Sequence, residues 1–73
     1  MDRGIAESAI KLFLGEIRQR LDEAASIAKA AQVCAEDGNV SKAVEIVLDV
    51  EQLSYESGNL LNAASTLNRI SEV

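Results

Sequence analysis

The chain has 73 residues, of which 48% are hydrophobic and only 3% aromatic, with one cysteine, no histidine and a formal net charge of -5. A domain of this size buries only about 60% of the surface that its unfolded chain exposes, and this composition offers neither a disulfide nor the usual structural zinc site. We therefore expect another chain to complete the core, and the negative charge to oppose binding to nucleic-acid backbones and anionic lipids.

The apolar runs of the sequence, such as residues 12–14, are far too short for a membrane span or a signal-peptide core. With no targeting segment and a single unpaired thiol, we expect a cytoplasmic protein that does not bind membranes.

From about residue 5 to residue 36, apolar residues recur at intervals of seven in three rows. The rows are Ile10, Ile17, Ala24 and Ala31; Leu14, Leu21, Ala28 and Ala35; and Phe13, Ile27 and Cys34. On a helix these rows lie side by side and form one broad apolar stripe, so the pattern predicts an amphipathic helix over about 5–36. Glu7 with Lys11, and Glu16 with Arg20, have the spacing of helical ion pairs.

Residues 36–39 read Glu-Asp-Gly-Asn and follow directly after this stripe. Gly38 can adopt the left-handed conformation that ends a helix, and Asn39 can cap the next one. The sequence predicts a turn over 37–39, and so short a connection makes the two flanking helices antiparallel neighbours.

A second heptad pattern extends over about 40–72, with Ile46, Leu53, Leu60 and Leu67 in its central row. Gly58-Asn59 repeats the Gly38-Asn39 pair, and a second turn there would give three helices, with a distant likeness to the turns of tetratricopeptide-type repeats. The heptad phase continues through Gly58 without a slip, however. This favours one helix, with a kink or a third helix at Gly58 as the alternative.

The sequence thus predicts a single all-α domain over 1–73, an antiparallel two-helix hairpin. Both apolar stripes are wider than one partner helix can cover, and Val47 and Leu61 widen the second, so we expect dimerisation into a four-helix bundle. The candidate interface residues are Phe13, Ile17, Leu53, Leu60 and Leu67.

No enzyme chemistry is expected, because histidine is missing and Cys34, the one thiol, falls within the apolar stripe as a core residue. No phosphate-binding, dinucleotide-binding or calcium-binding motif occurs, so we expect no cofactor, metal or small-molecule substrate. Glu45, Asp49 and Glu56 form an outward acidic row on the second helix. That row is either a solvated face or a contact surface for a basic partner.

These patterns favour a non-catalytic protein–protein interaction module that associates with itself or with another helical protein, as an adaptor, an inhibitor or an antitoxin-like regulator. The alternative is a nucleic-acid-binding regulator. In architecture the hairpin resembles plasmid copy-number regulators of the Rop type, antiparallel hairpin dimers that bind RNA with a helix face. Here Lys11 and Arg18, one heptad apart, would supply that face, although Glu7, Asp22 and Glu23 are interspersed with them.

Overall fold

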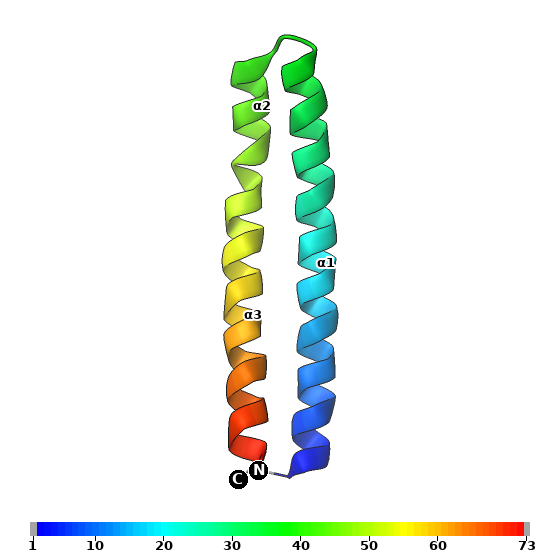
Figure 1. Cartoon of the computed structure of the whole chain (residues 1–73), viewed down its shortest axis with the longest axis vertical. Coiled ribbons are helices and arrows are strands. Elements are labelled where there is room, and N and C mark those ends of the chain that lie inside the picture. Colours follow the sequence, from blue (N-terminus) through cyan, green and yellow to red (C-terminus); the bar gives the residue numbers. More distant parts are fainter. Residues whose placement is uncertain (1, 73) are drawn as a thin grey trace.

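The computed structural model describes residues 2–72 and is an antiparallel helical hairpin (Figure 1). One half is a single helix, α1 (Arg3–Glu36), and the other contains two helices in line, α2 (Val40–Val47) and α3 (Asp49–Ser71). The hairpin is 54 Å long, and no strand occurs between residues 2 and 72. The all-α class and the hairpin are therefore confirmed. No helix in this part of the chain is long and apolar enough to cross a membrane.

The chain reverses direction through hydrogen bonds that end α1 and begin α2. Gly38 has a φ of +97°, a conformation that glycine adopts without steric cost. Its N–H donates to the Ala35 carbonyl at 3.0 Å and the Asn39 N–H donates to the Cys34 carbonyl at 3.1 Å, which is the Schellman arrangement. Asn39 Oδ1 then accepts from the Lys42 N–H at 3.3 Å and caps α2. The predicted roles of Gly38 and Asn39 are confirmed.

The thiol of Cys34 lies beside this turn, with its Sγ 3.5 Å from the Asn39 carbonyl oxygen. Cys34 is half-buried, so the expectation of a fully covered core residue is wrong. The reason is that only two helices meet here, and one side of each contact position stays open to solvent.

The second half of the hairpin bends at Leu48, between α2 and α3. The Leu48 N–H donates to the Val44 carbonyl at 3.2 Å, but the Glu51 N–H donates to the Leu48 carbonyl, only three residues back, also at 3.2 Å. This tighter spacing interrupts the α-helical pattern locally, while Leu48 keeps right-handed backbone angles and the chain continues onward. Gly58 lies inside α3, and the positive-φ glycine is Gly38. The favoured prediction that Gly58 lies within a helix is therefore confirmed, and the alternative of a kink or third helix at Gly58 is wrong.

The two halves of the hairpin pack along one continuous seam. Seam residues alternate between spacings of three and four, as in a coiled coil, and each is buried or half-buried. On α1 they are Ala6, Ile10, Phe13, Ile17, Arg20, Ala24, Ile27, Ala31 and Cys34. On α2 and α3 they are Ala43, Ile46, Val50, Leu53, Ser57, Leu60, Ala64, Leu67 and Ser71. The predicted heptad phase is thus the phase of the packing.

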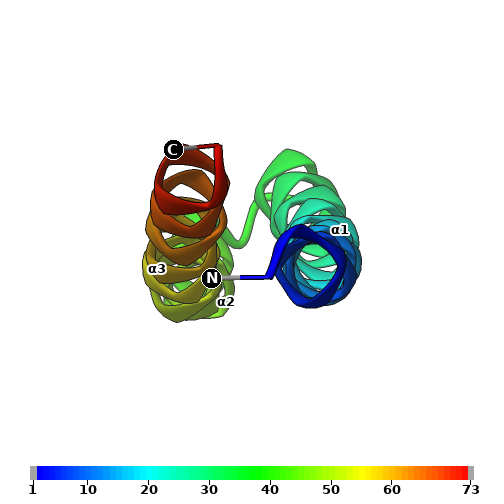
Figure 2. The same cartoon turned by 90° about the horizontal axis from the view of Figure 1, so that it is seen from below.

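At several layers of the seam a small residue on one side lies level with a larger one on the other, whereas at others, such as Ile17 with Leu60, two large residues are level. The turn and the Arg20–Glu56 ion pair set the register, which places Phe13 level with Ala64. This alternation lets the two halves approach closely, and Figure 2 shows them side by side when viewed along the hairpin. The buried apolar residues are all alanines, and no large side chain is fully buried within residues 2–72. A single hairpin therefore has a contact seam but no enclosed core.

Candidate interaction surface

The five predicted interface residues lie on the seam within one chain. Phe13, Ile17, Leu53, Leu60 and Leu67 are all half-buried between the two halves of the hairpin. Their inward sides contribute to the packing of the hairpin itself, and the remainder of each side chain stays open.

A charged layer interrupts the seam near the middle of the hairpin. The guanidinium of Arg20 donates from Nε to Glu56 Oε1 at 2.9 Å, across from α1 to α3. It also donates from Nη1 to Glu16 Oε2 at 2.5 Å, one helical turn back along α1, as the spacing of Glu16 and Arg20 predicts. Glu56 Oε2 accepts a further bond from Gln52 Nε2 at 3.0 Å. This network joins both halves of the hairpin on one side of the seam.

The network also shifts the ionisation of its members. The hydrogen bond from Gln52, followed by that from Arg20, lowers the pKa of Glu56 below its ordinary value of 4.5. The hydrogen bonds to Glu16 and then to Glu56 raise the pKa of Arg20 above its ordinary value. Each group is therefore held in its charged form.

Ser57 occupies the seam position beside this network, level with Arg20. Its residue exposure is 8%, and its Oγ has no hydrogen-bond partner among the described residues. A buried hydroxyl without a partner destabilises the state that contains it. The middle of the seam thus contains a buried polar group without a hydrogen bond among the described residues.

The three predicted acidic-face residues share one side of the second half of the hairpin, and two of them are already paired. Glu56 is engaged by Arg20, and Glu45 lies 3.5 Å from the Lys42 ammonium. The hairpin register brings Glu16 and Glu23 of α1 to the same side, next to Glu56 and Asp49. We call this side the acidic face; it consists of Glu16, Glu23, Glu45, Asp49 and Glu56.

The opposite side of the hairpin exposes apolar side chains. Each residue of this side directly follows a seam residue in the sequence; these seam residues are Phe13, Arg20, Ile27, Ile46 and Leu60. We call this side the apolar face; it consists of Leu14, Leu21, Ala28, Val47 and Leu61, and each of these is exposed. Leu14 is 54% and Leu61 58% exposed. Val47 and Leu61 were predicted as flanking residues of the second stripe, but the candidate interface residues all lie on the seam.

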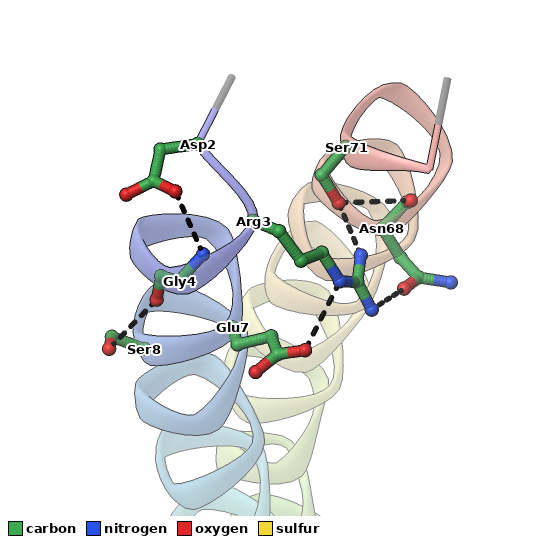
Figure 3. A network of polar contacts seen from close by, with 7 residues as sticks. All are labelled: Asp2, Arg3, Gly4, Glu7, Ser8, Asn68 and Ser71. Atoms are coloured by element: carbon green, nitrogen blue, oxygen red, sulfur yellow. Dashed lines mark hydrogen bonds and ion pairs between the residues drawn. The ribbon is translucent and has the colours of Figure 1, made fainter.

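Polar contacts close the open end of the hairpin (Figure 3). Arg3 donates to Asn68 Oδ1 at 3.1 Å and to the Ser71 hydroxyl, so it links the start of α1 to the end of α3. It also donates from Nε to Glu7 Oε1 at 3.2 Å, which means that Glu7 pairs with Arg3 and not with Lys11. These contacts join the start of α1 to the end of α3.

Lys11 and Arg18, the residues of the RNA-binding alternative, border a shallow open hollow on α1. Glu16 and Asp22 border the same hollow, and Asp22 Oδ2 lies 3.7 Å from Arg18 Nε. The two basic residues therefore stand among carboxylates and form no basic stripe. A second hollow lies at the bend, beside Leu48 and Tyr55, and no group of three or more potential metal ligands occurs among residues 2–72.

Comparison with known proteins gives no relative: no protein-family model matches the chain, and neither the curated proteins nor the solved structures contain a similar one.

Proposed function

We propose that this protein is a non-catalytic helical interaction module, cytoplasmic, that completes its core by packing against another helical chain. In the simplest form the second chain is its own copy, and two hairpins make a four-helix bundle. A module of this kind acts as an adaptor, an inhibitor or an antitoxin-like regulator, because its effect comes from binding another chain and covering part of that chain's surface.

The observation that carries this proposal is the amount of surface that the hairpin leaves uncovered. The chain exposes 5250 Å², whereas a compact monomer of 7.8 kDa exposes about 4,400 Å². The difference, about 900 Å², is close to what one partner buries in an interface of standard size, about 800 Å². One layer of two helices cannot enclose a hydrophobic core, whereas two packed layers bury the apolar residues between them.

Thermal unfolding followed by circular dichroism, at protein concentrations from about 1 to 100 µM, tests the proposal. If a partner copy completes the core, the midpoint rises with concentration, because unfolding then requires dissociation. If a different protein completes it, the isolated chain unfolds without cooperativity at every concentration. A sharp transition whose midpoint does not depend on concentration would mean that the hairpin is stable alone, and would overturn the proposal.

Retention on immobilised RNA and DNA distinguishes the module from a nucleic-acid-binding regulator. A chain of net charge -5 whose basic residues stand among carboxylates should flow through at low salt. Binding that weakens steeply with added salt would favour the nucleic-acid alternative.

A further inference from the structure

We infer that the second chain is a copy of this one, docked on the apolar face, with the two turns at the same end of the bundle. This inference rests on the proposed function and names the partner, the surface and the orientation.

The seam pattern decides which side of the hairpin is free for docking. In an antiparallel helix pair, the residues that directly follow corresponding seam positions lie on the same side of both helices. The contacts of Arg3 agree with this geometry, because Arg3 bonds to both Glu7 and Asn68. Glu7 lies one heptad before Leu14, and Asn68 lies one heptad after Leu61, so these two residues occupy the same side of the hairpin as the two leucines. The apolar face therefore extends across both halves of the hairpin, with Ser54 between Val47 and Leu61 on the second half. Arg20 turns to the other side, where Glu16 and Glu56 lie.

Charge favours a copy of the chain as the occupant of this face. The apolar face and its margin carry three acidic residues, Glu7, Glu51 and Glu72, and two basic ones, Lys11 and Arg18, so the charges on this side nearly cancel. The opposite side carries the acidic face. Two chains of net charge -5 repel one another in most orientations. They can meet with the least juxtaposition of like charges through this nearly neutral side.

The area also fits a dimer. The Cα extents of the hairpin are 54 Å by 14 Å in its plane, so one face covers about 750 Å² and two faces in contact bury about 1,500 Å², within the range of stable interfaces. This estimate agrees with the surface that the hairpin exposes in excess of a compact monomer.

The order of residues along the face favours one orientation. If the turns lie at the same end, α1 of each copy faces the second half of its partner at the same height. Leu14 then meets the partner's Leu61, whereas Leu21 meets the partner's Ser54. Ala28 lies between the partner's Val47 and the partner's Glu51. The two leucine pairs near the open end are thus the main apolar contacts.

If the turns lie at opposite ends, each helix faces its own copy in reverse. That arrangement brings Lys11 over the partner's Ala28 and Glu51 over the partner's Leu61. It covers charged groups with apolar ones, which costs free energy without any compensating partner. With both turns at one end, Lys11 lies level with the partner's Thr66, and only Glu51 lies over an alanine, the partner's Ala28. This orientation therefore covers fewer charged groups with apolar ones.

Two leucines of equal exposure test the docking face. Leu61 lies on the apolar face and is 58% exposed, whereas Leu48 lies on the outer surface at the bend and is 59% exposed. Leu61→Glu should weaken dimerisation by at least about 30-fold, as expected for a central interface residue, and Leu48→Glu by no more than about threefold. Leu14→Glu and Leu12→Glu form a second matched pair on α1. Dissociation by the outer variants and not by the face variants would overturn the assignment of the face, while the proposed function would stand.

A distance measurement on the otherwise unchanged face tests the orientation even if the face variants unfold. Ser41→Cys, in a Cys34→Ala background, places a spin label on the exposed start of α2. With the turns at one end, double electron–electron resonance between the two spin labels should give a separation below about 30 Å, because neighbouring helix axes lie only about 8–10 Å apart. A separation near the full 54 Å length of the hairpin would overturn the orientation. An unfolded monomer would overturn the choice of a second copy and leave the proposed function intact, whereas a stably folded monomer would overturn both.

Discussion

Replacing Ser57 by alanine should stabilise the protein. The hydroxyl of Ser57 is buried without a partner at the middle of the seam, and such a group costs about 1–3 kcal/mol relative to a site where it is solvated or removed. Alanine also has a higher helix propensity than serine, by about 0.5 kcal/mol, and the neighbouring small positions of the same seam, Ala43 and Ala64, already accommodate a methyl group. We expect a total gain of about 1.5–3.5 kcal/mol in the free energy of unfolding.

Urea unfolding followed by circular dichroism measures this gain, with all variants at one protein concentration because association contributes to stability. Ser26→Ala is the control, since Ser26 is exposed in the interior of α1 and reports helix propensity alone, about 0.5 kcal/mol. If Ser57→Ala gains no more than Ser26→Ala, the hydroxyl has a partner and the polar layer does not weaken the seam. A loss of stability would refute the reasoning outright.

The remaining predictions concern the turn, the charged layer and the thiol. Gly58→Ala should raise the free energy of unfolding by about 0.5–1 kcal/mol, because Gly58 is helical and a Cβ would meet no atom within 4 Å; Gly38→Ala should lower it by about 1–2 kcal/mol, because Gly38 has a positive φ, and the opposite order in urea midpoints would contradict both. The bonds that lower the pKa of Glu56 favour the folded state above pH 4.5 and lose this contribution as the pH falls through the lowered folded-state pKa. The stability difference between wild type and Glu56→Gln should therefore shrink between pH 7 and pH 3, and a constant difference would show that the bonds do not form. Half-buried Cys34 should react with a thiol reagent more slowly in the folded than in the unfolded protein, and equal rates would show that the seam does not cover it.

Local chemistry explains which parts of the fold could be predicted from the sequence. The turn was predictable to the residue, because Gly38 and Asn39 each have one well-defined role at a helix boundary and the hydrogen bonds at both are short-range. The heptad phase predicted the seam for the same reason, since the period of the apolar residues is the period of the packing. The helical state of Gly58 was also predictable, because the heptad phase continues through it. The alternative of a turn there arose because glycine permits a turn without requiring one.

The other features depend on contacts between distant parts of the chain. The bend at Leu48 involves neither glycine nor proline and consists of a shift of one hydrogen bond, so no residue type signals it. Arg20 occupies a seam position that a charged residue was not expected to fill, and its bond to Glu56 appears only once the two halves are in register. The sequence shows the apolar face only as extra apolar residues beside the heptad rows. Seam residues can be distinguished from apolar-face residues only in the folded hairpin, where the opposite helix covers the seam residues and leaves the apolar-face residues exposed.

Sedimentation equilibrium of the wild-type protein at low micromolar concentration tests most directly whether a second copy completes the hairpin. A chain of 7.8 kDa that docks on its own copy should sediment as a species of about twice that mass and retain the circular dichroism spectrum of a helical protein. A helical species of 7.8 kDa that unfolds cooperatively would contradict this expectation, because the apolar face would then remain uncovered in a stable monomer.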